Sequence, residues 1–283
     1  LRRAGGPPFR GRPAPGRIMR GRFGGRSSRD RLLSCLPPLL LFIGWYVVTS
    51  SGFVPEYLLP SPSAVWETVA AYMGGSSGDA YAGRFWGDLT ASLFRVGCGY
   101  LLGVLPGVAL GLASGRSRAL SALLSPVING VRAVPGISWL PLALLWLGVG
   151  FRATVFLIAL AGFFPAYLNA AAGAASVPPV LIRAGRMLGL NRRAVFFRVV
   201  VPSAMPQVRT GLRVALGMSF SYLVLGELTG VPDGLGALIM DARLAGRVDL
   251  LVSGIILIAL VGWLCDVLLV RLLSAVSLSL RRQ

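Results

Sequence analysis

Long apolar stretches separated by short polar segments make up most of the chain from residue 32 onward. A helix needs about 20 apolar residues to cross about 30 Å of hydrocarbon, and six stretches are long enough. They are residues 32–50, 92–113, 119–149, 153–175, 204–226 and 250–274. Because proline interrupts a helix, Pro126, Pro135 and Pro141 predict a broken third span. The pattern predicts an all-α, polytopic membrane protein with about six transmembrane helices.

The composition agrees with lipid as the main solvent and excludes several kinds of chemistry. Hydrophobic residues make up 55% of the 283 residues and charged residues 13%. The sequence contains no Lys and no His, which removes a P-loop lysine, an imidazole base and histidine metal ligands. Cys35, Cys98 and Cys265 lie in apolar runs without paired spacing. We therefore expect no enzyme activity, no catalytic residue, no metal and no cofactor bound by this chain.

The arginines predict the orientation of the spans. With a cytoplasmic N-terminus, 22 of the 28 arginines fall in inside segments and eight of the ten acidic residues fall in outside segments. Positive charge is retained on the cytoplasmic side of membrane proteins, so both termini are expected in the cytoplasm. The two sizeable outside segments are residues 51–91 and 227–249. The one sizeable inside segment between spans is residues 176–203.

Residues 1–31 form a separate region that carries ten of the arginines in a Gly- and Pro-rich sequence. Without apolar periodicity, this region is expected to be a disordered cytoplasmic tail held near anionic lipid headgroups rather than a nucleic-acid-binding arm. The sequence begins with Leu1, and Met19 offers an alternative start within the tail. Residues 32–283 are expected to form the transmembrane domain.

A glycine recurs at every fourth position of the second span, over five positions. Four residues are slightly more than one helical turn, so these glycines form one bare stripe on the helix. Such a stripe lets a neighbouring backbone approach closely, and in lipid this packing drives association. The spacing leaves open whether the neighbour lies in the same chain or in a second protomer. The predicted packing residues are Gly99, Gly103, Gly107, Gly111 and Gly115.

The third span is the candidate for lining a translocation path. Pro135, Gly136 and Pro141 interrupt one apolar stretch, and a broken helix at membrane depth is tolerated where it is buried in protein or faces a water-filled cavity. A kink without function is the alternative.

Few ionisable residues lie in or near the spans. They are Arg95, Arg132, Glu227 and Asp266. Charges at membrane depth are often functional, although a position near an interface explains them as well. We expect Glu227, where the fifth span meets the outside, to be the one most able to affect substrate or gating.

The basic inside segment carries a second pattern. Its arginines alternate with apolar residues at roughly helical spacing, which is typical of short amphipathic helices at a membrane surface. A positively charged anchor without a partner is the alternative interpretation.

Residues 183–202, RAGRMLGLNRRAVFFRVVVP, resemble the EAA signature of binding-protein-dependent ABC importer permeases. In that signature Glu-Ala-Ala is followed by Gly four residues later and then by Ile-x-Leu-Pro. The segments VPGISWLPLALLWLGVG and DGLGALI are similar to the nitrate, sulfonate and taurine branch of the family. The sequence departs from the signature at Arg183, where the signature has Glu, and at Gly185, where it has Ala.

The resemblance implies a type I ABC importer permease fold in a bacterial inner membrane, with a cytoplasmic coupling helix. It implies a role as the permease subunit that forms the path for a small solute such as a sulfonate, nitrate or taurine. The implied partners are a cytoplasmic ABC ATPase dimer, an extracytoplasmic substrate-binding protein and a second permease protomer, with ATP and Mg on the ATPase. The implied ATPase-coupling residues are Arg183, Ala184, Gly185, Arg186, Leu188, Gly189 and Pro202.

Two other classes of function compete with this interpretation. A secondary transporter or channel predicts ionisable relay groups at the centres of the spans, where this sequence has few. A membrane scaffold would use the basic tail but would leave the glycine stripe and the basic inside segment without a common explanation.

Overall fold

The computed structural model describes residues 28–75 and 78–280, and side chains for residues 36–75 and 78–275. The chain divides into two compact units, residues 1–47 and 48–283. Helix α1 (Ser28–Ser50), which contains Pro37 and Pro38, begins in the first unit and ends three residues beyond its boundary. The predicted tail up to residue 27 lies outside the described residues.

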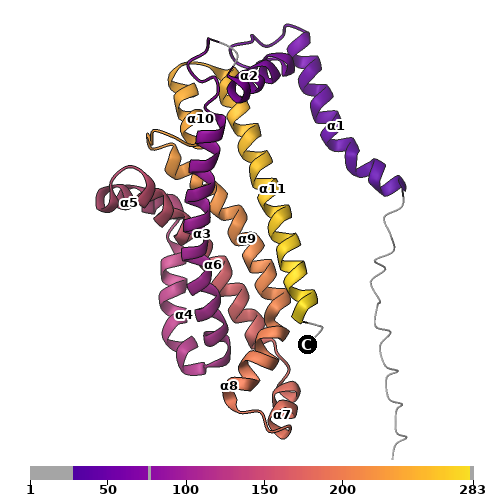
Figure 1. The fold of residues 1–283 in the computed structure, drawn as a ribbon, viewed down its shortest axis with the longest axis vertical. Coiled ribbons are helices and arrows are strands. Elements are labelled where there is room, and N and C mark those ends of the chain that lie inside the picture. Colours follow the sequence, from indigo (N-terminus) through magenta and orange to yellow (C-terminus); the bar gives the residue numbers. More distant parts are fainter. Residues whose placement is uncertain (1–27, 76–77, 281–283) are drawn as a thin grey trace, which may run out of the picture. The chain divides into compact units, whose positions relative to one another are not determined.

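The second unit consists of helices connected by short turns, as Figure 1 shows. Its α-helices are α2 (Pro62–Gly74), α3 (Phe85–Arg116), α4 (Arg118–Ala133), α5 (Leu140–Leu147), α6 (Phe151–Ala175), α7 (Pro179–Met187), α8 (Arg192–Val195), α9 (Val201–Glu227), α10 (Leu235–Leu244) and α11 (Val248–Leu280). A 3₁₀ turn, η1 (Gly136–Trp139), precedes α5, and a π-helical turn, η2 (Phe196–Val200), joins α8 to α9. The all-α class predicted from the apolar pattern is confirmed for this part of the chain.

Helix α6 lies at the centre of the second unit, and α3 packs along it through the glycine stripe. A Cβ built on Gly99 would lie 2.9 Å from the carbonyl oxygen of Val155, and one on Gly107 would lie 2.8 Å from that of Phe163. The pattern repeats at four-residue intervals, with Gly103, Gly111 and Gly115 against the carbonyls of Ala159, Tyr167 and Ala171. Since both sets of numbers increase together, the two helices run parallel. The neighbour that the sequence left open is therefore α6 of the same chain.

A second face of α6 packs against α9 in the same close manner. A Cβ on Gly211 would lie 3.0 Å from the carbonyl oxygen of Pro165, and one on Gly173 would lie 3.0 Å from that of Ala204. Near the other end of the pair, Gly226 lies against Thr154. Here one set of numbers rises as the other falls, so α9 runs antiparallel to α6.

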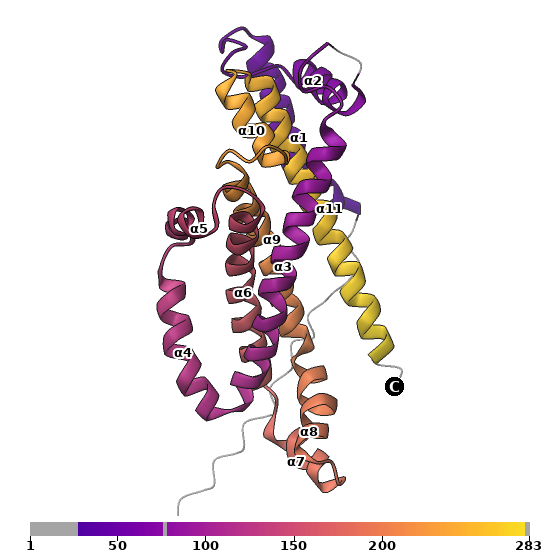
Figure 2. The same ribbon diagram turned by 60° about the vertical axis from the view of Figure 1, so that its left-hand side comes forward.

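The predicted outside and inside segments lie at opposite ends of the second unit. Helices α2 and α10, from residues 51–91 and 227–249, lie at one end, and α7 and α8, from residues 176–203, lie at the other (Figures 1 and 2).

Three helices in the described part of the chain are long and apolar enough to cross a membrane: α3, α6 and α11 through Ala275. Helix α4 and the run Gly136–Leu147 meet the same test only together, and they are bent by 89° at the break. The break predicted within residues 119–149 is thus observed, while its crossing of the membrane and the total of six spans stay predictions.

The close approach of α3 to α6 predicts that bulk on the glycine stripe destabilises the protein. Gly107→Leu would force the two backbones apart, and overpacking of this kind costs about 1–3 kcal/mol. Gly97→Leu is the matched control on the same helix, because a Cβ there meets no atom within 4 Å. The measurement is the fraction of detergent-solubilised protein that stays monodisperse after heating. Equal thermal stability of the two variants would contradict this packing role.

Candidate translocation path and coupling surface

The third span breaks at the dipeptide Pro135-Gly136. Helix α4 ends at Ala133, and Pro135 has extended backbone (φ −54°, ψ 132°), which ends the first half-helix before the 3₁₀ turn begins. Gly136 lies directly against the phenol of Tyr222 on α9, so any side chain at position 136 would overlap that ring. The break is therefore also a contact between the third span and α9.

A cavity of 440 Å³ lies between this break, α6 and α9. Its wall is mainly apolar and includes Trp139, Leu160, Phe164 and Met218. Its polar side chains are Arg132, Asn169 and Tyr222, in addition to the indole N–H of Trp139. A mainly apolar pocket with a few polar groups is typical of a small-molecule site. Two of the predicted path residues, Pro135 and Gly136, line it.

The other two predicted path residues lie elsewhere. Pro141 occupies the first turn of α5, where its missing N–H leaves no helical bond unmade. Glu227 is at the C-terminal end of α9, is fully buried, and is not among the residues that line this cavity.

Glu227 is the centre of a buried charged cluster that joins α3, α9 and α10. Arg95 of α3 donates from Nη1 to Glu227 Oε1 at 2.7 Å, and Ser92 Oγ donates to the same oxygen at 2.8 Å. Arg95 also pairs with Asp233 and donates to the Asp233 carbonyl at 2.9 Å. A buried charge is tolerated when it is paired and its remaining lone pairs are bonded, and Glu227 meets both conditions.

The same cluster caps the N-terminus of α10. The first backbone N–H groups of a helix lack partners within it, and here three side chains from other helices accept them. Gly234 donates to Asp88 at 2.9 Å, Leu235 to Ser92 at 2.9 Å and Gly236 to Glu227 at 2.8 Å. Gly234 has φ +115°, and a Cβ there would lie 2.5 Å from a Glu227 oxygen. A glycine is therefore needed on both steric and conformational grounds.

Helix α2 joins this end through Tyr72, whose hydroxyl donates to Asp88 at 2.7 Å. Burial, together with this hydrogen bond, raises the pKa of the Tyr72 phenol, so it remains protonated and a donor. Nearby, Arg247 pairs with Asp79 and with Asp249, and its guanidinium holds the pKa of Asp79 below the usual range.

At the other end, α7 closes with a glycine turn. Gly189 has φ +81°, and its N–H donates to the Arg186 carbonyl at 3.0 Å. Leu190 donates to the Gly185 carbonyl at 3.1 Å, which completes a Schellman motif. The turn fixes the direction in which the chain leaves α7.

The α7–α8 segment has one anchored face and one free face. Ile182 and Val195 are buried in a cluster with Ala174 and Val177 of the preceding chain and Ala204 of α9. Met187 and Leu188 are 87% and 83% exposed. The remaining predicted coupling residues in this segment divide between the faces, with Gly185 buried and Arg183, Ala184 and Arg186 exposed.

Pro202 explains the π-helical turn that precedes it. It has no N–H to donate to residue 198, and its ring would crowd that carbonyl, so the helix widens before it. The Val201 N–H bonds instead to the Phe196 carbonyl, five residues back. This turn lies where the α7–α8 segment joins α9.

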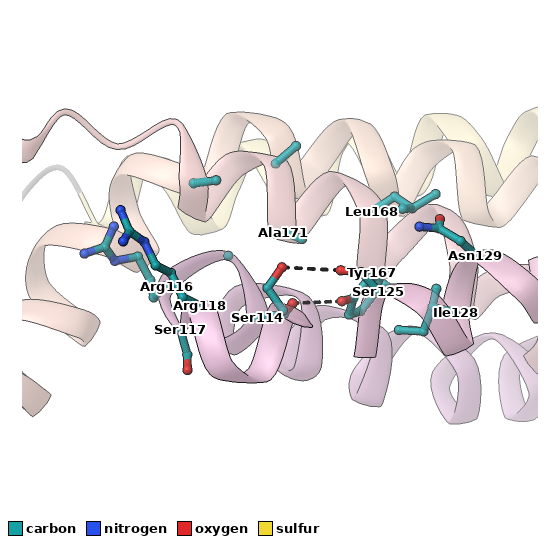
Figure 3. Close-up of a pocket in the computed structure, with 14 residues that line it drawn as sticks. Ser114, Arg116, Ser117, Arg118, Ser125, Ile128, Asn129, Tyr167, Leu168 and Ala171 are labelled. Carbon is teal, nitrogen blue, oxygen red and sulfur yellow. Dashed lines mark hydrogen bonds between the residues drawn. The ribbon is translucent and has the colours of Figure 1, made fainter. Parts of the chain in front are cut away.

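A second cavity, of 550 Å³, opens where α3, α4 and α6 meet (Figure 3). Its polar lining includes Arg116, Arg118 and Asn129, and Tyr167 donates to Ser114 at 2.8 Å across it. Sequence reasoning did not identify this cavity or the contacts of Glu227. The only available signal for the latter was an Arg and a Glu near the same predicted end of two spans.

The buried cluster predicts a large loss of stability when Glu227 is truncated. Glu227→Ala would leave Arg95 without its carboxylate partner on α9 and the Gly236 N–H without an acceptor, and breaking a buried pair in this way costs about 3–5 kcal/mol. Asp79→Asn is the control, because partly exposed pairs contribute only about 0–1 kcal/mol. Thermal unfolding in detergent measures both, and equal effects would contradict the central role of Glu227.

Comparison with known proteins agrees with this arrangement. The profile of the family described as "Binding-protein-dependent transport system inner membrane component" matches residues 103–282. The taurine transport system permease protein TauC of Escherichia coli is 35% identical over 84% of this chain and 86% of its own length. The bicarbonate transport system permease protein CmpB of Synechocystis is 30% identical over 84% of this chain and 87% of its own length.

A solved structure shares the fold. A chain of the MetNI methionine ABC transporter, in inward-facing conformations, superposes with a TM-score of 0.54 at 20% identity, covering 68% of this chain and 93% of that one. The family profile spans the broken span, the α7–α8 segment and the Glu227 end of α9. The chain therefore belongs to the family of binding-protein-dependent transport system inner membrane components.

Proposed function

We propose that the chain is the permease subunit of an ATP-driven importer, in which two protomers enclose one path for a small anion. An ABC ATPase dimer binds from the cytoplasm, and a substrate-binding protein delivers the solute from outside. The α7–α8 segment is the feature that carries this proposal. It combines an anchored face, a rigid glycine turn and an exposed apolar and basic face at one end of the molecule.

The exposed face of this segment has the chemistry of a helix that docks in a groove. Exposed apolar side chains supply the contact area, and exposed arginines favour an acidic rim. Arg183 stands where the resembled signature has Glu, so the groove that receives it is expected to be acidic or neutral there. A movement of the segment would then be transmitted to α9 through the π turn and Pro202, which join the two.

ATP and Mg are proposed to bind the partner ATPase alone. This chain has no Lys, and hence no P-loop lysine for the phosphates. Closure of the ATPase dimer would move the two α7–α8 segments together and rock the spans from inward-facing to outward-facing.

The substrate class follows from the relatives. Their names include taurine, aliphatic sulfonates and bicarbonate. Sulfonates and bicarbonate are small oxyanions, and taurine carries a sulfonate group. We therefore propose a small oxyanion as the solute, with selection among such anions shared with the binding protein.

A secondary transporter fits the observed contacts less well. The carboxylates of Glu227 and Asp266, in the long helices α9 and α11, are bonded to Arg95 and Arg213. A proton relay needs carboxylates that can exchange protons with the path. Glu227 is bonded to Arg95 and Ser92 and is not among the residues that line the cavity beside the third span.

The proposed orientation can be tested by thiol labelling. Met187→Cys at the exposed tip of α7 should react with a membrane-impermeant reagent only after permeabilisation, and Glu67→Cys on α2 should react in intact cells. The physical reason is that the arginine-rich end stays in the cytoplasm. Labelling of the thiol introduced at position 187 in intact cells would overturn the orientation.

The proposed coupling can be tested at Gly189. Gly189→Val forces a β-branched residue into positive φ, at a cost of about 1–2 kcal/mol, without a steric clash. It should misdirect α7 and abolish ATPase stimulation while the helices remain packed. Gly189→Asn is the matched control, because Asn tolerates this conformation and should retain coupling.

Arg183→Glu tests the same surface through charge and should weaken co-purification with the cognate ATPase. If Gly189→Val and Arg183→Glu both keep wild-type association and binding-protein-stimulated ATP hydrolysis, the α7–α8 segment is not the coupling surface.

The permease chain purified alone should hydrolyse no ATP. ATP turnover by rigorously pure protein would contradict the proposal that ATP binds the partner ATPase alone.

A further inference from the structure

The cavity beside the broken span has an unbalanced positive charge. Arg132 is the charged member of the residues that line it, and the other polar side chains there, Asn169, Tyr222 and Trp139, are neutral groups that bear N–H or O–H donors. The rest of the wall is apolar, and a charge beside low-dielectric walls acts over a longer distance than it does in water.

The acidic residues that could balance Arg132 are bonded elsewhere. Within the described side chains, seven carboxylates pair with four other arginines: Asp88 and Asp241 with Arg84, Glu227 and Asp233 with Arg95, Asp266 with Arg213, and Asp79 and Asp249 with Arg247. Glu56 and Glu67 belong to the segments around α2, at the far end. No carboxylate among the described side chains therefore pairs with Arg132. Its guanidinium N–H groups are available to a ligand.

We infer that Arg132 is a specificity-determining residue, and that this cavity holds a small organic oxyanion during transit. This inference rests on the proposed function and assigns the anion a place in the path. The planar guanidinium matches two oxygens of a sulfonate or carboxylate. The amide of Asn169 donates one N–H to the Pro165 carbonyl at 2.9 Å and has a second N–H to offer. Leu160, Phe164 and Met218 provide an apolar wall for a short carbon chain.

The break in the third span adds to this preference for anions. The helical run Gly136–Leu147 begins at the wall of the cavity. The free N–H groups at a helix start carry partial positive charge, and half-helices of this kind face anionic substrates in other transporters. A cation entering the cavity would meet positive charge without a carboxylate to offset it.

Thiol chemistry inside the cavity tests the inference directly. Met218→Cys places a thiol on the cavity wall, in a full chain whose Cys35, Cys98 and Cys265 are changed to Ser. The protein is purified with its cognate ATPase and reconstituted in liposomes. The probes are 2-sulfonatoethyl methanethiosulfonate, which is itself a short sulfonate, its trimethylammonium analogue, and neutral methyl methanethiosulfonate, which reports accessibility.

The measured quantity is the ratio of the sulfonate to the ammonium modification rate at the thiol introduced at position 218. Removing the one charge on the wall of the same cavity should lower this ratio by about ten-fold or more in Arg132→Gln and in Arg132→Met. Arg132→Lys should keep it within about three-fold of the parent, since it keeps the charge. Arg116→Gln is the matched control, because it removes an arginine from the other cavity and should leave the ratio unchanged.

A ratio that is the same with and without the charge at position 132 would overturn the inference. So would a thiol at position 218 that reacts with none of the three reagents, because the cavity would then be closed to solutes. Binding-protein-stimulated ATP hydrolysis by the same preparations reports the proposed function separately. If the parent protein shows no stimulated ATP hydrolysis but its rate ratio still depends on Arg132, the proposed importer function is wrong and the inference about the anion-selective cavity stands.

Discussion

The close packing of α6 against both α3 and α9 is the contact on which the other features depend. Glycines remove the side chains that would hold the helices apart, so backbone meets backbone along the whole of α6. In lipid there is little hydrophobic gain from helix association, and dispersion contacts at short range must supply it. The three helices thereby form a fixed core, and the broken third span packs on it and leaves cavities rather than a filled interface.

Helix α9 connects the two ends of this core. It begins after the π turn beside the α7–α8 segment and ends at Glu227 in the buried cluster. Because Glu227 both pairs with Arg95 and caps α10, the far end of α9 is fixed to α3 and α10 together. One continuous helix therefore connects the α7–α8 segment to the buried cluster at the opposite end, without an intervening loop.

The positions and partners of the charged side chains follow from the free-energy cost of burying a charge. A charge in an apolar medium is stable when a partner and hydrogen bonds replace its water, and the Arg95–Glu227 pair satisfies this requirement at the predicted outer end. Arg132 differs, since the described side chains give it no acidic partner and it lines a cavity. The contrast separates a buried pair that holds helices together from an exposed cation without an acidic partner among the described side chains.

Local sequence patterns determined a large part of this protein. The apolar runs fixed the helical class, since backbone groups in lipid must bond within their own segment. Pro135 determined the break, and Gly189 determined the end of α7, because each acts through its own backbone dihedral angles. The basic segment and its signature identified the family before any contact was known.

Only the tertiary structure decided which helix meets the glycine stripe and what surrounds Glu227. The stripe fits any helix with small residues, so its pairing with α6 depends on how the whole chain packs. Glu227 was predicted beside the path, yet its partners Ser92, Arg95 and Gly236 come to it from α3 and α10, and α3 is far away in sequence. Likewise, the sequence identified Arg132 only as one of the few ionisable residues in or near the spans, and the arrangement of α4, α6 and α9 places it on a cavity. Such contacts are long-range, and periodicity and propensity report only on near neighbours along the chain.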